Sequence, residues 1–328
     1  MAYAAPFWSP AQASAILFDW DGVIAETSLD FSPIREKYYG GRRAMLLEEA
    51  GTLPPDRREA LMRDLEELEM EGAYRSHPVP GIEEVLAWVE ERAIPWAVVS
   101  RNCRRSILAA AEATGVDLPA VVRSRDDGET VKPDPDALLE TCAALGVPAS
   151  QTLFIGDFIY DMIGARRTGM RGVLVRGKTE PDWTPWLECS YTSMHDLARE
   201  LRNPSRMIPW EYQSVTSKHG TRYLEKTYRK TLEIPLDAGP DMATWVLSAA
   251  SLGVGTFLLP NLTLTPELWK SSPAFDPSLM GQPLSCAVSR LLAARFPFAQ
   301  ASCAAEMERA RETPHEARLL EEYLAELA

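Results

Sequence analysis

Short apolar runs alternate with amphipathic segments between residues 16 and 203. The apolar runs have the length and composition of buried β-strands, namely Ile16–Phe18, Trp96–Ser100, Ala120–Arg123, Thr152–Ile155 and Gly172–Val175. Apolar positions recur with helical spacing in the segments between or beside them, namely Ile82–Arg92, Arg104–Thr114, Asp136–Leu145 and Tyr160–Thr168. This alternation predicts an α/β fold with a Rossmann-like, doubly wound parallel sheet, in which ligands bind at the carboxyl ends of the strands.

One interval interrupts this alternation. No convincing strand is found between about residues 26 and 80, and Arg42–Ala50 and Pro55–Tyr74 are charged and helical in character. We therefore expect a small helical insert, called the cap below, directly after the loop that follows the first strand. The insert carries basic side chains that either contact an anionic substrate or form a solvated charged face, which is the simpler interpretation: Arg35, Lys37, Arg42 and Arg43.

The pattern changes after residue 203, where prolines punctuate the chain. One long uncharged stretch, Met242–Leu259, is interrupted by Gly253 and Gly255. We interpret it as a buried helix, a glycine stop and a strand Thr256–Leu259, with a membrane span as the minor alternative. A terminal helix is predicted from Thr313 as N-cap, with Pro314, Glu316 and one apolar face following: Leu319, Leu320, Tyr323, Leu324 and Leu327.

The chain therefore divides into two expected domains, residues 1–203 with the cap at about 26–80, and residues 204–328. We expect the second to be a C-terminal α+β domain, and we recognise no family in it. Its aromatic residues either build its core or form a binding or oligomerisation surface, and the core is the interpretation we favour: Trp210, Tyr212, Tyr223 and Tyr228.

The net charge and the cysteine content limit the classes of binding partner and the compartment that we expect for this protein. The 328 residues carry a formal net charge of −13, which argues against nucleic acid or an anionic membrane as the main partner. The five cysteines are odd in number and form no CxxC pair, and residues 1–15 lack the features of a signal peptide. A reducing, cytoplasmic location is expected. Oligomeric state stays open, a homo-oligomer included.

Two acidic motifs, far apart in sequence, each follow an expected strand. The first is Asp19-Trp20-Asp21-Gly22 and the second contains Asp157 and Asp161. Neighbouring parallel strands would bring these carboxylates to one sheet edge, where a hard cation such as Mg²⁺ would neutralise them. Asp19 is the candidate nucleophile and Asp21 the candidate general acid and base. Taken alone, the first motif could also be explained as a structural turn rich in aspartate.

Two further loops supply candidate phosphate-binding groups. Ser100 ends an expected strand, and Arg101 and Asn102 follow it before a helix begins. The alternative is that Ser100 or Asn102 only caps that helix. Lys132, in Val131-Lys132-Pro133-Asp134-Pro135, offers an ammonium that would offset charge on the nucleophile and the phosphoryl group. The alternative is that Lys132 is an exposed turn residue without a role in the site.

The second acidic motif has two different roles to offer. Asp157, at the strand end, is the best direct metal ligand besides Asp19. Asp161 would hold the metal's waters or orient Lys132, or it would simply favour the N-terminus of a helix.

In order along the chain, DWDGVI, VVSRN, KPDPD and GDFIYD resemble the motifs of the haloacid dehalogenase superfamily, phosphoglycolate phosphatase-like subgroup. The resemblance covers about residues 12–203. It implies Mg²⁺, an aspartyl-phosphate intermediate on Asp19, acid–base work by Asp21, and metal ligation by side chains of Asp19 and Asp157 and the backbone carbonyl of Asp21. The implied function is a phosphatase acting on a small phosphomonoester.

Two alternatives stay open at this point. A phosphosugar mutase of the β-phosphoglucomutase type would use the same residues. In the other alternative, the phosphatase fold is partly a scaffold for a C-terminal binding or oligomerisation module.

Overall fold

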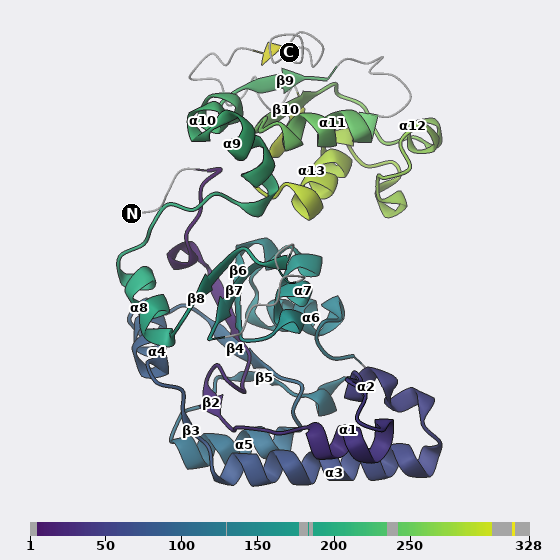
Figure 1. The fold of residues 1–328 in the computed structure, drawn as a ribbon. Coiled ribbons are helices and arrows are strands. Elements are labelled where there is room, and N and C mark those ends of the chain that lie inside the picture. The colour runs from purple at the N-terminus through teal and green to yellow at the C-terminus, as the bar shows by residue number, and fades with distance from the viewer. Residues whose placement is uncertain are drawn as a thin grey trace. The chain divides into compact units, whose positions relative to one another are not determined.

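The computed structural model describes residues 5–128, 130–176, 183, 186–234, 242–303 and 317–318 (Figure 1). The chain divides into two compact units. One is Pro10–Pro204, and the other joins Met1–Ser9 to Ser205–Ala328. The sequence grouped residues 1–9 with the first unit. In the structure, Trp8 instead exchanges backbone hydrogen bonds with Met207, at 3.2 and 2.9 Å, which ties the N-terminal segment to the C-terminal unit.

The first unit is built on a parallel sheet with the strand order β5-β4-β1-β6-β7-β8. Its strands are β1 (Ala15–Phe18), β4 (Trp96–Val99), β5 (Val121–Arg123), β6 (Thr152–Gly156), β7 (Arg171–Val175) and β8 (Cys189–Tyr191). β1, β6 and β7 are buried along their whole length because helices cover both faces of the sheet. The predicted doubly wound sheet is confirmed.

Helices flank this sheet on both sides (Figure 1). They are α4 (Ile82–Glu91), α5 (Arg104–Thr114), α6 (Pro135–Leu145), α7 (Ile159–Thr168) and α8 (Met194–Arg202). α6 shows how the sequence sets their ends. The Asp134 side chain accepts a hydrogen bond from the backbone N–H of Asp136 at 2.9 Å, Pro135 takes the first helical position, and the helix ends at Gly146.

One buried cluster joins α6 and α7 to the sheet. It contains Leu17, Phe154 and Leu174 from the strands, with Leu138 from α6 and Met162 from α7. Full burial of each such side chain contributes about 1.5–3 kcal/mol. This packing fixes the strand ends, and with them the loops that carry the acidic motifs.

The helical cap follows β1, as predicted. It consists of α1 (Ser32–Tyr39), α2 (Leu46–Glu49) and α3 (Pro55–Tyr74), and the short antiparallel strands β2 (Ala25–Glu26) and β3 (His77–Pro78) enclose it. α3 lies along α5 of the core (Figure 1). The cap has its own small apolar core, which includes Ile34, Tyr38, Leu46, Leu61 and Leu65.

The sequence placed the cap's shorter helices imperfectly. α3 has the predicted bounds, but the prediction of a helix from Arg42 was wrong, because the helix begins at Leu46. Gly40 and Gly41 have positive φ and Met45 is extended, so the chain turns over these residues. α1 was missed because its sequence, Ser-Pro-Ile-Arg-Glu-Lys-Tyr-Tyr, shows little apolar periodicity. The two residues of β3 are likewise too few to leave a periodic signal.

The C-terminal unit contains a second parallel sheet, with the order β11-β10-β9-β12. Its strands are β9 (Thr231–Glu233), β10 (Thr256–Leu259), β11 (Gln300–Cys303) and β12 (Ala317–Arg318). Its helices are α9 (Gln213–His219), α10 (Thr221–Tyr228), α11 (Met242–Ser251), α12 (Pro266–Ser271) and α13 (Leu284–Arg295). The expected class was α+β, whereas the described strands are all parallel, which is an α/β arrangement.

Three expectations for this unit have an outcome. The helix, glycine stop and strand within Met242–Leu259 are confirmed as α11 and β10. Tyr212 is fully buried in an apolar cluster with Phe7, Val215 and Leu224, as the core interpretation predicts. None of the described helices combines the length and apolar character needed to cross a membrane.

The predicted terminal helix after Thr313 lies almost wholly outside the described residues. The two described residues within it, Ala317 and Arg318, pair with β9 as a strand, so the helix prediction is wrong there. Pairing with an existing strand supplies backbone hydrogen-bond partners that local capping signals do not reveal.

Candidate active site

Three neighbouring strands of the first sheet end at the same edge. Phe18 of β1 lies opposite Val98 of β4 on one side and Ile155 of β6 on the other. The loops that follow these strands carry Asp19, Ser100 and Asp157 respectively, and the parallel pairing therefore brings the predicted site residues together.

Carboxylates crowd this edge. Asp19, Asp157 and Asp161 each place one carboxylate oxygen so that all three oxygens lie within 4.8 Å of one another. Burial, followed by the charges of Asp19 and Asp161, raises the pKa of Asp157 to about 8. Burial is also the main cause that raises the pKa of Asp161 to about 6, although Lys132 counteracts it. The carboxylates at this edge carry more negative charge than the nearby positive charge balances. Such a cluster of oxygen ligands suits a hard divalent cation such as Mg²⁺.

Lys132 is the buried cation of this cluster. Its side chain is 1% exposed, and its Nζ atom lies 2.7 Å from Asp19 Oδ1 and 2.8 Å from Asp161 Oδ1. Burial acts against its charge, but the carboxylates of Asp161 and Asp19 outweigh burial and raise its pKa. The charged lysine therefore links the loop after β1 to the first turn of α7, and the alternative of an exposed turn lysine is wrong.

Gly22 allows the first loop to pass Asp157. Its φ of +69° lies in the left-handed region, and a Cβ atom at this position would overlap the carboxylate of Asp157. The DxDG motif thus needs glycine both for backbone conformation and for space.

Asp21 has two polar side-chain partners. Thr27 Oγ1 donates to Asp21 Oδ1, and Asn102 Nδ2 donates to Asp21 Oδ2. Burial raises the pKa of Asp21 to about 7, against the effect of these two hydrogen bonds. A carboxyl with a pKa near neutrality suits an acid–base role. No signal in the sequence points to Thr27, which meets Asp21 only because the chain folds back through β2.

The loop after β4 places its residues differently from one another. Ser100 is buried, and its Oγ accepts from the backbone N–H of Asn102 at 3.2 Å. Arg101 reaches the cap, where it donates to the two carboxylate oxygens of Glu48 at 2.6 and 2.9 Å. The N-cap of α5 is Cys103, whose sulfur accepts from the backbone N–H of Ser106 at 3.4 Å. The capping alternative for Ser100 or Asn102 is therefore wrong.

A cavity of about 460 Å³ opens over these groups. Asp19, Asp21, Ser100, Arg101 and Asn102 contribute to its lining from the core. The remaining lining residues are Phe31, Arg35, Arg43–Leu47, Leu65, Glu69, Arg125, Phe158–Tyr160 and Trp183. Of these, the sequence had named Arg35 and Arg43, for which contact with an anionic substrate was one of two interpretations. The volume falls within the range of about 300–1,000 Å³ typical of small-molecule sites.

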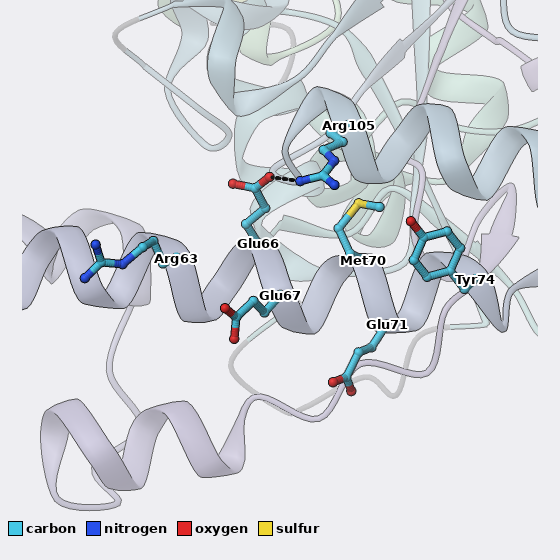
Figure 2. Close-up of a pocket in the computed structure, with 7 residues that line it drawn as sticks. All are labelled: Arg63, Glu66, Glu67, Met70, Glu71, Tyr74 and Arg105. Carbon is cyan, nitrogen blue, oxygen red and sulfur yellow. Dashed lines mark hydrogen bonds and ion pairs between the residues drawn. The ribbon is translucent and has the colours of Figure 1, made fainter.

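A second hollow, of about 430 Å³, lies on the exposed side of α3 and is lined by residues of α3 together with Arg105 of α5 (Figure 2). Its side chains are Arg63, Glu66, Glu67, Met70, Glu71, Tyr74 and Arg105. None of the carboxylates of the acidic cluster reaches it. It is a surface groove between two helices, and we assign it no part in the chemistry.

Comparisons with known proteins agree with this geometry. Residues 34–175 match the haloacid dehalogenase-like hydrolase family. Over 193 residues the chain is 31% identical to an N-acetylmuramic acid 6-phosphate phosphatase of Pseudomonas aeruginosa, covering 52% of this chain and 85% of the relative. A pyrophosphatase of Halalkalibacterium halodurans is 28% identical over 210 residues, or 57% of this chain and 95% of the relative. The chain belongs to the haloacid dehalogenase-like hydrolase family.

A solved structure of a hydrolase from Pseudomonas syringae shares the fold, with a TM-score of 0.50, 20% identity, and coverage of 58% of this chain and 99% of that chain. The protein is thus an enzyme, a phosphatase of the haloacid dehalogenase-like family. Its C-terminal unit lies outside the residues that match the family.

The raised pKa of Asp157 predicts that stabilisation of the protein by Mg²⁺ depends on pH. Its ordinary pKa is 3.8, so between about pH 4 and 8 the folded protein holds a proton that the unfolded chain has released. Stability without metal then falls as pH rises through this window, and a cation that replaces the proton stabilises the phosphatase more at the upper end. We expect MgCl₂ to raise Tm, relative to EDTA, more at about pH 8.5 than at about pH 6.

Asp157→Asn is the control for this prediction, because it removes the proton that competes with the cation. Its response to MgCl₂ should be smaller and should vary less between the two pH values, with the remaining variation due to Asp21 and Asp161. Equal shifts of Tm at both pH values in the wild type would contradict the prediction.

A buried ion pair joins the cap of the phosphatase to its core. Glu69 of α3 is 3% exposed and pairs with Arg125, which is 6% exposed and follows β5. The other carboxylate oxygen of Glu69 accepts from the backbone N–H of Cys103 at 2.9 Å. Arg125 also donates to the carbonyl of Arg101 at 3.3 Å. The pair therefore supports the loop that holds Asn102 against Asp21.

Removing one partner of this pair should be costly. We expect Glu69→Gln to lower the free energy of unfolding by about 3–5 kcal/mol, because Arg125 keeps a buried charge without its carboxylate. The measurement is urea unfolding followed by circular dichroism.

The chain offers a matched control in Figure 2. Glu66, one turn earlier on α3, pairs with Arg105 of α5 at 3.1 Å, but its side chain is 41% exposed. Glu66→Gln should change stability by less than about 1 kcal/mol. A similar loss for both variants would show that burial of the Glu69 pair does not matter.

Proposed function

We propose that this protein is a Mg²⁺-dependent phosphatase that hydrolyses a small phosphomonoester through an aspartyl-phosphate intermediate on Asp19. The observation that carries the proposal is the placement of Asp19. Its carboxylate lies at the end of β1, paired with buried Lys132 at 2.7 Å, and Asp21 stands two residues on with a pKa near 7.

In the first step, a carboxylate oxygen of Asp19 attacks phosphorus. The new bond joins Asp19 to phosphorus, and the bond from phosphorus to the substrate oxygen breaks. Asp21, in its protonated form, gives its proton to the departing oxygen. The backbone N–H of Trp20 donates to Asp19 Oδ1 at 2.7 Å and, with Lys132, fixes the orientation of the nucleophile.

In the second step, Asp21 acts as a carboxylate. It takes a proton from water, the water oxygen attacks phosphorus, and inorganic phosphate leaves with Asp19 regenerated. Thr27 and Asn102 hold the two oxygens of Asp21 throughout, which keeps the group directed for both transfers. A pKa of about 7 lets the same group serve as acid and base at neutral pH.

The other site residues bind and balance charge. Ser100 and the backbone N–H groups after it would bind phosphoryl oxygens, with Asn102 beside them, and Lys132 would offset the negative charge. Arg101 is bound by Glu48, so we infer that it supports the cap rather than the phosphate. Mg²⁺, held by Asp19, Asp157 and the backbone carbonyl of Asp21 with support from Asp161, would supply positive charge that attracts and polarises the phosphoryl group.

The test is phosphate release from a panel of phosphomonoesters and pyrophosphate, measured with MgCl₂ and with EDTA. Turnover with MgCl₂ and loss of turnover with EDTA would support the proposal. Absence of phosphate release from every substrate would contradict it. If hexose phosphates interconvert without net phosphate release, the mutase alternative, which uses the same residues, replaces the phosphatase.

The setting of the enzyme is also a proposal. All five cysteines are free thiols, which supports a reducing compartment such as the cytoplasm. We further infer that residues 205–328, together with residues 1–9, form a domain of their own, since this unit contains a separate sheet and a separate apolar core. Deletion of this domain should leave Mg²⁺-dependent turnover in place, whereas loss of turnover in a folded truncated protein would contradict its independence.

A further inference from the structure

The cavity over Asp19 extends well beyond the place of a phosphoryl group. Its catalytic end contains Asp19, Asp21 and Ser100. Its other wall comes from the cap, with Phe31 and Arg35 of the α1 region and the segment Arg43–Leu47. The part of the substrate that departs from phosphorus would lie against this cap wall. Side chains there are therefore placed to select the leaving group.

The arginines that line the cavity differ in their partners. Arg101 is paired with Glu48, and Arg125 with Glu69. Arg43, which also lines the cavity, has an interaction partner as well. Arg35, by contrast, has no ion pair with a carboxylate among the residues that the structure describes, and its Nε atom is buried without a hydrogen-bond partner there. A buried N–H group that finds no partner is unfavourable, so Arg35 is prepared to receive an acceptor.

One contact holds Arg35 at the wall of the cavity. Its guanidinium lies over the ring of Phe31, 5.8 Å from the ring centre. Phe31 and Arg35 both line the cavity, so the contact keeps the guanidinium beside the space that a substrate would occupy.

Two other basic residues of the cap insert have partners outside the cavity. Lys37 pairs with Asp64 at 2.6 Å and Arg42 pairs with Glu49, and each basic side chain is 59% exposed. Neither lines the cavity. The solvated-face interpretation therefore describes Lys37 and Arg42, but not Arg35 and Arg43, which both line the cavity.

We propose that Arg35 is a specificity-determining residue that binds a second anionic group on the leaving part of the substrate. The inference rests on the proposed phosphatase function and narrows its substrates to phosphomonoesters that carry a further oxyanion. A guanidinium binds carboxylate and phosphate alike through paired N–H donors, so the shared chemistry is an oxyanion with two acceptor oxygens.

The experiment compares matched substrates that differ only in that group. For a carboxylate, the pairs are 2-phosphoglycolate with 2-hydroxyethyl phosphate, and 3-phosphoglycerate with glycerol 3-phosphate. For a second phosphate, the pair is propane-1,3-diol bisphosphate with 3-hydroxypropyl phosphate. The readout is the ratio of kcat/KM within each pair, for wild type, Arg35→Gln and Arg35→Lys. The pair with the largest ratio identifies which oxyanion the site prefers.

We expect wild type to favour the anionic member of at least one pair, and Arg35→Gln to lower that ratio by about 10- to 100-fold, the size of a charge-assisted hydrogen bond. Arg35→Lys should keep part of the ratio, because it keeps the charge and loses the paired donors. Arg58→Gln is the matched control: Arg58 is an exposed arginine on α3 that does not line the cavity, and its removal should leave the ratio unchanged.

Each outcome decides between the two proposals. If Arg35→Gln leaves the ratio of kcat/KM within each pair unchanged, or if that ratio is near one in the wild type, the proposed role of Arg35 is overturned. Turnover of the members that lack the second oxyanion would in that case still support the phosphatase. Absence of turnover for every member in wild type would overturn the phosphatase, and this inference with it. Thermal unfolding of each variant shows that the comparison is made on folded protein.

Discussion

Replacing Asp19 with asparagine is expected to lower phosphate release by about 10⁴-fold or more, as removal of a covalent nucleophile does in other enzymes. The amide is a poor nucleophile and cannot form the mixed anhydride with phosphate. Because Asn keeps the size of Asp, Lys132 keeps its pairing with Asp161 at 2.8 Å, and the fold should persist. The measurement is single-turnover and steady-state phosphate release with MgCl₂.

Two controls make this result specific. Asp56→Asn makes the same change at an exposed position in the first turn of α3, and should leave turnover as in the wild type. In the wild type, rapid acid quenching followed by peptide mass spectrometry should find a phosphoryl group on the peptide that contains Asp19. Turnover by Asp19→Asn at more than about a hundredth of the wild-type rate would exclude covalent catalysis at this residue.

Replacing Lys132 with methionine is expected to affect both activity and stability. The side chain has a similar length, but two carboxylates, those of Asp19 and Asp161, lose their common buried cation. We expect the free energy of unfolding to fall by about 3–5 kcal/mol near pH 8 in EDTA. Turnover should fall by about 10²–10³-fold, since the phosphoryl charge loses one preorganised partner.

The pH dependence of this loss has a definite sign. Without the ammonium, the pKa of Asp161 should rise above its present value of about 6, so the variant binds a proton that the wild type does not. The unfolded chain releases that proton near its ordinary pKa of 3.8. Stability of the variant therefore falls more steeply than that of the wild type as pH rises, and the two proteins should be closer in stability at about pH 5 than at about pH 8.

Lys37→Met provides the control for Lys132→Met. Lys37 is a lysine of the cap whose side chain is 59% exposed and which pairs with Asp64. Its replacement should leave the free energy of unfolding close to that of the wild type at either pH. A stability gap between Lys132→Met and wild type that does not change with pH would show that the loss comes from packing and not from charge.

The local pattern of the chain determined most of the first unit. α3 and α5 have the bounds that periodicity and capping signals predict, because each is long enough for its apolar positions to repeat. Four strands, β1, β4, β6 and β7, were predicted from short apolar runs between turns. A strand that is buried on both faces consists almost entirely of apolar residues, so its sequence is easy to recognise. The family's motifs then identified the strand ends that carry chemistry.

The candidate site was predictable where a single loop defines it. Asp19, Asp21 and Gly22 lie within four residues, and the positive φ of Gly22 is what such a turn requires. The sequence also indicated Lys132 and Asp161, but it left the choice open between a buried pair and a solvated lysine. That choice depends on the distance in space between a loop residue and a residue in the first turn of α7, which stand 29 positions apart in the sequence, at 132 and 161.

The sequence by itself determined which residues follow the strands, because the strands are local apolar signals. The tertiary structure alone decided which charged side chains form ion pairs with one another. It separated Arg35, whose Nε is buried beside the cavity, from Lys37, which pairs with Asp64, although both stand on one short helix. It likewise joined Glu69 to Arg125 across 56 positions. Electrostatic pairing depends on distance and burial in space, and neither is encoded in the spacing of residues along the chain.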